Sequence, residues 1–299
     1  MNTELTVEEI LQHFENWLHT RYRLNSVRNI ITAAVSLMEW CKEKNINPIQ
    51  LSYAELLGYI QFCSSNGNGK TTINQKITGL KHFYNYLQLL MIRDENPVEE
   101  IRIRNATRKV LGDIIPYETL ENLYAAYPLN GVNRQRNKAI IGLMVYQALT
   151  TGELEALEVK DLKLEEGKIF IPSVSRSNSR TLKLEAQQLI HLQNYLLKIR
   201  PLFMAVSRKQ ITKLFMSRGK SSKLGNSQFR LINEIRKVNP GIKDLRQIRA
   251  SVIAHWYKLH HARQVQYMAG HRYVSSTEHY RTNRIETLQE QLEKIHPIQ

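Results

Sequence analysis

The sequence predicts a mainly α-helical protein of two domains, the second of which also contains a small β-hairpin or sheet. Its 299 residues are enough to bury two separate cores. Apolar residues recur at helical spacing over most of the chain, whereas they alternate with polar residues, as in strands, within 162–172 and 180–186. A basic stretch that starts with a helix-breaking Asn-Pro pair separates the two helical parts. We therefore predict a first domain at 1–101, a basic linker at 102–115 and a second domain at 116–299.

Four helices are predicted in the first domain. Thr6 with Glu9, and Ser52 with Glu55, have the S/T-x-x-E pattern of a capping box, which marks two helix starts. The loop at 64–70 opens the fourth helix. Apolar residues at helical spacing predict the second helix, at Val27, Ile30, Ile31, Ala34, Leu37 and Met38.

The charge of the chain indicates a polyanionic partner. The formal net charge is +15 at pH 7 and the isoelectric point is about 9.7. Lysines and arginines are spread through helical segments instead of gathering beside an apolar face, which favours nucleic acid over a membrane surface. The candidate phosphate contacts lie around the fourth helix and in the linker, at Lys70, Thr71, Asn74, Lys76, Lys81, Arg102, Arg104, Arg108 and Lys109. For any one of these residues, ordinary solvent exposure is the alternative interpretation.

Cysteine usage and the N-terminus predict a cytoplasmic protein. Cys41 and Cys63 are the only cysteines and form no CxxC motif, so we expect neither a disulfide scaffold nor a zinc finger. The first residues lack the basic start and apolar core of a signal peptide, and no apolar run reaches the length of a membrane span. The second domain contains histidines but no HExxH motif or paired-carboxylate context, so no metal or other cofactor is predicted.

The stretch from Pro240 to Asn283 contains residues suited to phosphoryl chemistry. A tyrosine hydroxyl, here that of Tyr280, can attack a phosphodiester as a covalent nucleophile without ATP or a metal. Arg246 and His271 would stabilise the extra negative charge on the phosphate oxygens during the attack. Gly270 suits a sharp turn at a helix end, which would aim His271 into a cleft. Taken singly, each of these residues also fits an ordinary structural role.

With Thr277 included, the order of these residues resembles the Gly-His-x-x-x-x-x-Thr-x-x-Tyr pattern of the tyrosine recombinases, the phage-integrase family. The resemblance implies a core-binding domain and a catalytic domain that close around double-stranded DNA. It implies site-specific cleavage and rejoining of strands through a 3′-phosphotyrosine, with integration or excision of a mobile element. It also implies a bacterial, nucleoid-associated homo-tetramer on two DNA sites with exchange of C-terminal tails. Docking of the tail on its own domain is the alternative.

Three polar positions depart from the family pattern. Aligning Glu153 on the glutamate of the first active-site box places Thr150 where the family has its first catalytic arginine. Lys243 replaces the histidine that opens the second box. It is either a supporting cation that could also donate a proton, or a solvated surface lysine. The hairpin loop has no lysine to act as the family's general acid. Arg176 is a candidate stand-in that could steady the phosphate, although arginine is a poor proton donor, whereas we assign Arg180 a structural role.

Arg249 is a further candidate for the missing positive charge, because it lies three residues after Arg246 on the same helical face, where the family usually has an apolar residue.

Two functions remain open. The alternative function is a catalytically weak or inactive relative that binds recombination sites as an accessory protein. A nicking enzyme of the type IB topoisomerase kind shares the chemistry, but no residue favours it. The favoured function is an active recombinase with catalytic residues Tyr280, Arg246, His271, Lys243 and Arg176.

Overall fold

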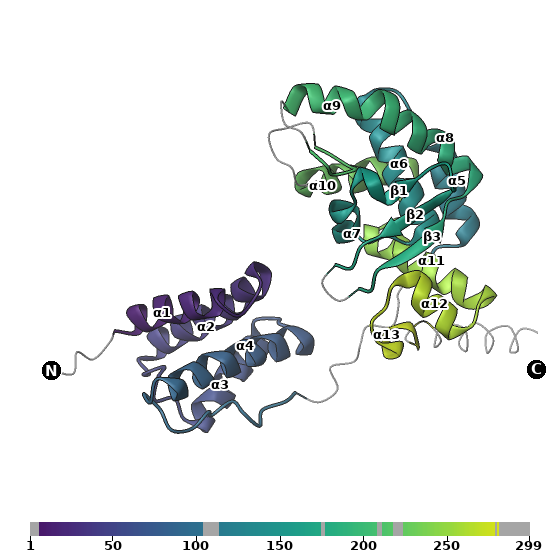
Figure 1. Cartoon of the computed structure of the whole chain (residues 1–299). Helices are drawn as coiled ribbons and strands as arrows, with labels where there is room; N and C mark the ends of the chain where they lie inside the picture. The colour runs from purple at the N-terminus through teal and green to yellow at the C-terminus, as the bar shows by residue number, and fades with distance from the viewer. Residues whose placement is uncertain are drawn as a thin grey trace, which may run out of the picture. The chain divides into compact units, whose positions relative to one another are not determined.

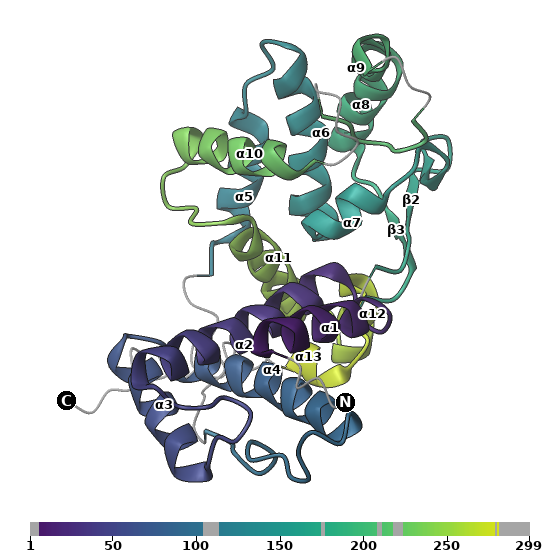
Figure 2. The same ribbon diagram turned by 90° about the vertical axis from the view of Figure 1, so that its left-hand side faces the viewer.

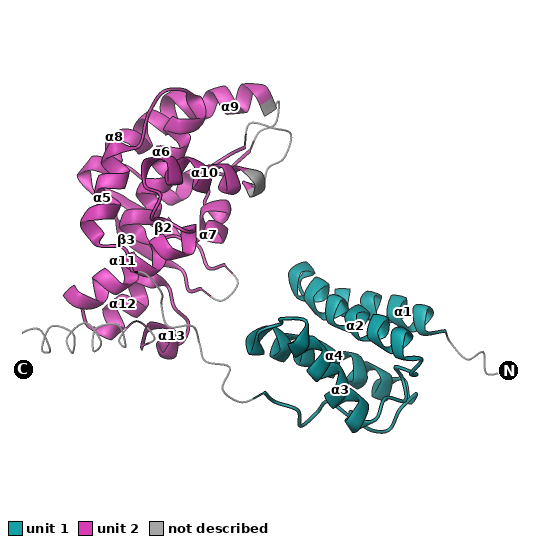
Figure 3. Cartoon of the chain, turned by 180° about the vertical axis from the view of Figure 1, so that it is seen from behind, with its two compact units in different colours: residues 1–109 teal, residues 110–299 magenta. Residues whose placement is uncertain are grey.

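The computed structural model describes residues 6–103, 114–174, 177–207, 211–217, 224–278 and 280. The chain divides into two compact units, residues 1–109 and residues 110–299 (Figure 3). The division lies inside the predicted linker at 102–115. Arg104, Arg108 and Lys109 of that linker lie outside the described residues, and Arg102 is exposed.

The first unit contains the four helices that the sequence predicts (Figure 1). Both predicted capping boxes are present, because the side chains of Thr6 and Ser52 accept hydrogen bonds from the backbone of Glu9 and Glu55. The fourth helix begins at Lys70, whereas the sequence placed this residue just before the start. The helices are α1 (Val7–His19), α2 (Leu24–Lys44), α3 (Tyr53–Ser65) and α4 (Lys70–Leu89).

The core of the first unit combines aliphatic and aromatic side chains, and within it Phe14 packs edge-on against Phe83 with ring centroids 5.4 Å apart. Helices α2 and α4 approach closely at Gly79, since a Cβ atom there would lie 2.6 Å from the Cβ atom of Ala33. Periodic apolar stripes therefore meet in one core, as amphipathic helices require.

The second unit is built around one buried helix, α6 (Val132–Gln147), in which every side chain from Arg136 to Gln147 is buried. A helix that is buried on all sides lies at the centre of its domain. Figure 2 shows α6 among α5, α7 and α10. The surrounding helices are α5 (Tyr117–Ala126), α7 (Thr151–Ala156), α8 (Ala186–Asn194), α9 (Arg200–Ser207), α10 (Gly225–Val238), α11 (Leu245–Leu259), α12 (Ala262–Ala269) and α13 (Val274–Glu278).

A three-stranded antiparallel sheet, with the order β1-β2-β3, lies against this helical core. The first of the two segments predicted as strands contains both β1 (Leu162–Lys163) and β2 (Lys168–Ile171), because the chain reverses at Gly167, whose φ is 61°. The third strand is β3 (Arg180–Lys183), and its Leu182 pairs with Ile169. The mainly helical fold with a small sheet is thus confirmed. Among the described residues, no helix is long and apolar enough to span a lipid bilayer.

Candidate active site

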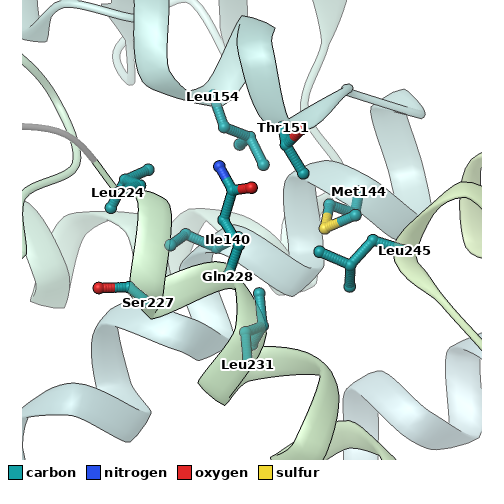
Figure 4. Close-up of a pocket in the computed structure, with 9 residues that line it drawn as sticks. All are labelled: Ile140, Met144, Thr151, Leu154, Leu224, Ser227, Gln228, Leu231 and Leu245. Atoms are coloured by element: carbon teal, nitrogen blue, oxygen red, sulfur yellow. The ribbon is translucent and has the colours of Figure 1, made fainter. Parts of the chain in front are cut away.

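The start of α11 is held by one cap and one apolar anchor. The Asp244 side chain accepts a hydrogen bond of 2.8 Å from the backbone N–H of Gln247 and so caps the helix. Leu245 lines a small apolar pocket together with residues of α6, α7 and α10, and Figure 4 shows it beside Met144. The next residue, Arg246, is exposed. The Asp-Leu-Arg sequence thus fixes the helix start while Arg246 stays accessible to a ligand.

The Gly-His pair ends α12 as the sequence predicts. Gly270 is the left-handed C-cap with φ 69°, and its carbonyl accepts a hydrogen bond of 2.9 Å from the backbone N–H of Asn178. Ser177 pairs with His271 as an isolated β-bridge. The segment that leads into β3 therefore lies beside the Gly-His pair, although about ninety residues separate them in sequence (Figure 1).

His271 and Tyr280 lie together at this place. Their rings are 6.0 Å apart between centroids and nearly parallel, at 17°. The Nδ1 atom of His271 is 2.9 Å from the hydroxyl oxygen of Thr277, a buried residue that fixes the imidazole orientation. Burial lowers the pKa of His271 to about 4, and the charges of Arg249 and Arg180 act in the same direction. His271 is therefore neutral near pH 7.

Tyr280 is half-buried, and burial raises the pKa of its hydroxyl, while the charge of Arg249 acts to lower it. A nearby cation stabilises the phenolate, the form that is nucleophilic. Tyr280 thus lies beside a neutral imidazole and feels the charge of Arg249, which offsets part of the effect of burial on its pKa.

Two arginines share one glutamate beneath the Gly-His pair. Nη1 of Arg180 is 2.6 Å from one carboxylate oxygen of Glu153, and Nη1 of Arg249 is 3.5 Å from the other. Burial would raise the pKa of Glu153, but the hydrogen bond and charge of Arg180, helped by Arg249, hold it below its ordinary value. We call these three residues the buried ion cluster. It joins α7, β3 and α11.

Thr150 is the N-cap residue of α7. Its hydroxyl accepts a hydrogen bond of 3.1 Å from the backbone N–H of Glu153 and lies 3.0 Å from the carboxylate of the same residue. The carboxylate in turn accepts a bond from the backbone N–H of Thr150, which completes a capping box. The Thr150 hydroxyl is thus engaged in local structure.

Residues 115–286, most of the second unit, match the model of the phage integrase family. The chain belongs to the phage integrase family. This confirms the family that the Gly-His and tyrosine pattern predicted, and it supports a role in site-specific DNA recombination and DNA binding.

Integrase-family relatives match over most of the chain. A tyrosine recombinase of Pseudothermotoga lettingae is 27% identical over 195 residues, which cover 64% of this chain and 66% of the relative. A tyrosine recombinase XerC of Thermodesulfovibrio yellowstonii is 24% identical over 309 residues, which cover 99% of this chain and 98% of the relative.

Solved integrase-family structures share the fold. The XerH site-specific recombinase bound to a palindromic difH substrate, in a post-cleavage complex, has a TM-score of 0.71 at 16% identity, over 97% of this chain and 90% of that chain. A lambda integrase dimer bound to a COC′ core site has a TM-score of 0.66 at 13% identity, over 93% of this chain and 95% of that chain.

Two of the predicted catalytic residues of this integrase-family chain, His271 and Tyr280, lie together. Arg246 and Lys243 are exposed around the start of α11 and are not members of the buried ion cluster. Arg176 lies outside the described residues and directly precedes Ser177, which pairs with His271.

The predicted phosphate contacts of α4 also differ among themselves. Lys70 and Thr71 are exposed. The side chain of Asn74 exchanges two hydrogen bonds of 3.0 Å with the backbone of Ile103. The other two amines bond inside the first unit: Lys76 donates to the Ser36 hydroxyl at 2.9 Å, and Lys81 donates to the carbonyl of Glu99.

Sequence reasoning gave Arg180 a structural role without finding its partner. A signal was present, because Thr150 and Glu153 have the same S/T-x-x-E spacing that marked two helix starts in the first unit. That spacing predicts a capping box at the start of α7 but not the burial of its glutamate, since the capping-box residues Glu9 and Glu55 of the first unit are not buried. The need for a cation follows from the burial of Glu153, which the structure shows.

Proposed function

We propose that this chain is a site-specific DNA recombinase that cleaves and rejoins strands through a covalent 3′-phosphotyrosine at Tyr280. The observation that supports this best is the position of Tyr280, with its ring 6.0 Å from that of His271 and the Arg249 charge acting on its hydroxyl. Those three groups supply a nucleophile, a hydrogen-bonding imidazole and a cation at one place.

The proposed cleavage step exchanges one ester bond for another. The Tyr280 oxygen loses its proton to solvent water and bonds to phosphorus. The bond from phosphorus to the 5′ oxygen breaks, and the 5′ oxygen takes up a proton and leaves as a hydroxyl. Attack by a 5′ hydroxyl of the partner strand reverses the step and releases Tyr280. No bond energy is lost, so no ATP enters the balance.

His271 acts in this scheme as a neutral donor. When the Thr277 hydroxyl donates to Nδ1, the ring proton is on Nε2, which then donates to a non-bridging phosphate oxygen. Arg246 is accessible for the same oxygens. Lys243 is the proposed proton source for the 5′ oxygen, with Arg176 as a further cation, since arginine does not release a proton near neutral pH.

The proposed partner is double-stranded DNA, held by both units in a homo-tetramer on two sites with exchange of C-terminal tails. The exposed Lys70 and Thr71, at the start of α4, and Arg102 are the proposed phosphate contacts of the first unit. Arg104, Arg108 and Lys109 of the linker are proposed to add to them.

Trapping of a covalent protein–DNA adduct tests the proposal. Wild type and Tyr280→Phe are incubated without added metal with nicked duplex fragments tiled across the DNA that flanks the gene, and the products are separated on a denaturing gel. A nick next to the cleavage site lets the short 5′ fragment diffuse away, so the adduct accumulates. We expect an adduct from wild type and none from the variant.

A second candidate function is an accessory protein that binds recombination sites without cutting them. The engagement of the Thr150 hydroxyl in a helix cap favours it, because no charged group stands at that family position. Sequence-specific retention of a fragment in a native gel, with no covalent adduct on any tiled fragment, would replace the recombinase proposal with this one.

A further inference from the structure

The buried ion cluster carries more positive than negative charge. Only 1% of the Glu153 side chain is exposed, compared with 0% for Arg180 and 14% for Arg249. Two guanidinium groups share this one carboxylate, and no other acidic residue forms an ion pair with either of them in the described part of the chain. A surplus charge in a buried setting is costly unless an anion compensates it.

Arg180 has an unused donor at this place. Its Nε atom donates to the carbonyl of Met268 at 2.7 Å and its Nη1 atom donates to Glu153. Its Nη2 atom is buried and has no hydrogen-bond partner among the described residues. Buried donors are nearly always satisfied in native proteins, so this one indicates a ligand or solvent that completes the site.

Arg249 is the member of the cluster that reaches solvent. Its guanidinium bridges two helix ends, since Nη1 donates to the carbonyl of Ala148 after α6 and Nη2 donates at 2.7 Å to that of Ala269 at the end of α12. Ala148 lies two residues before Thr150, and Ala269 lies two residues before His271. The guanidinium is thus fixed between the altered family position and the Gly-His pair.

We propose that Arg249 binds the phosphate that Tyr280 attacks and supplies the guanidinium that is absent at position 150. Arg180 and Glu153 are positioning residues that hold Arg249 and the Gly-His turn. An arginine side chain at position 150 would lie close to the Glu153 carboxylate, because the Thr150 hydroxyl is already 3.0 Å from it. Arg249 pairs with the same carboxylate from α11. In this proposal α11, and not the start of α7, therefore supplies the positive charge.

This inference rests on the proposed recombinase function and is tested on the nicked fragment that gives most adduct with wild type. Arg249→Ala should slow adduct formation about 100- to 1,000-fold, the usual effect of removing one donor to a developing oxyanion. Fragment affinity in native gels should change far less. Arg249→Lys keeps the charge but loses the bidentate geometry of the guanidinium. Its rate of adduct formation should therefore lie between those of wild type and Arg249→Ala.

Relocation of the arginine provides the sharper test. Thr150→Arg combined with Arg249→Ala places the guanidinium at the family position. This double variant should form adduct at least about ten times faster than Arg249→Ala alone. A fragment with an uncharged methylphosphonate at the cleaved position should reduce the ratio of adduct-formation rates between wild type and Arg249→Ala. The transition state then has less negative charge for Arg249 to stabilise. A purely structural role for Arg249 predicts neither effect.

Arg200→Ala is the matched control. Arg200 also donates to two backbone carbonyls of the second unit, those of Ile211 and Lys213, but it is not part of the buried ion cluster. We expect wild-type adduct formation from Arg200→Ala. Thermal unfolding of each variant shows whether its fold is kept, and if Arg249→Ala unfolds at the assay temperature, Arg249→Lys and the relocated variant decide.

The possible failures are distinguishable. A folded Arg249→Ala that forms adduct at the wild-type rate overturns the role of Arg249 and leaves the recombinase function standing. A folded double variant that recovers nothing, together with an unchanged ratio of rates on the methylphosphonate fragment, also overturns it. If wild type forms no Tyr280-dependent adduct on any fragment, the recombinase proposal fails, and this inference fails with it.

Discussion

Gly270 lies directly against the guanidinium of Arg180, so that a Cβ atom on residue 270 would come within 2.8 Å of Cζ of Arg180. The same glycine has φ 69°, a conformation that other residues rarely adopt. Space and conformation thus require glycine here for separate reasons. Because Arg180 is held by Glu153, this contact joins the turn that carries His271 to the buried ion cluster.

Gly270→Ala should therefore destabilise the second unit more than the backbone conformation alone explains. The left-handed conformation costs an alanine roughly 1–2 kcal/mol, and overlap with Arg180 adds to this. Gly167→Ala is the control, because Gly167 has φ 61° but open space around its Cβ position. Urea unfolding should show a clearly larger loss for Gly270→Ala. Equal losses would mean that Arg180 moves aside at little cost.

Glu153→Gln should be among the most destabilising single substitutions in the chain. It removes the one carboxylate of the buried ion cluster and leaves two buried guanidinium groups without a counter-charge. Breaking a buried pair in this way costs about 3–5 kcal/mol. Glu166→Gln, whose glutamate is half-exposed and pairs with Lys163 and Lys168, should cost less than about 1 kcal/mol. Similar losses in denaturant unfolding would contradict the assignment of this cluster as a structural support.

The stability of the free protein should fall as pH decreases from about 6.5 towards 4, and His271 should account for part of this. Its pKa is lowered from 6.5 to about 4, mainly by burial. In that window the unfolded chain takes up a proton on this residue and the folded chain does not, so acid favours unfolding. His271→Gln lacks this group. The free energy of unfolding, measured at about pH 7 and about pH 5, should therefore change less in the variant than in wild type. An identical change in both would show that His271 titrates normally.

Lys70 and Lys76 should behave differently although both lie on α4. Lys70→Ala removes an exposed amine and should reduce the slope of log affinity against log salt by about one unit for DNA binding, as loss of one phosphate contact does. The Lys76 amine bonds the Ser36 hydroxyl inside the first unit, so Lys76→Met should alter thermal stability and leave that slope unchanged. If only Lys76→Met reduced the slope of log affinity against log salt, Lys76 and not Lys70 would be the phosphate contact.

Local sequence patterns predicted much of the fold because they act over a few residues. The capping boxes at Thr6 and Ser52 and the turn at Gly270 depend on hydrogen bonds and dihedral angles within a short segment, and the structure confirms each. Thr150 and Glu153 have the same capping-box pattern, but these two positions were compared only with the first active-site box of the family. Alternation predicted strand character across 162–172, but the positive φ of Gly167 divides that segment into two strands.

By itself, the sequence determined the family, the mainly helical fold and the pairing of His271 with Tyr280, because these follow from periodicity and from a motif of close spacing. Only the tertiary structure decided that Glu153, Arg180 and Arg249 form one buried cluster beside them. Their positions are as much as 96 residues apart, and no local pattern relates them. The physical reason is that a buried carboxylate takes its counter-charge from whichever elements pack against it, and packing is a property of the whole domain.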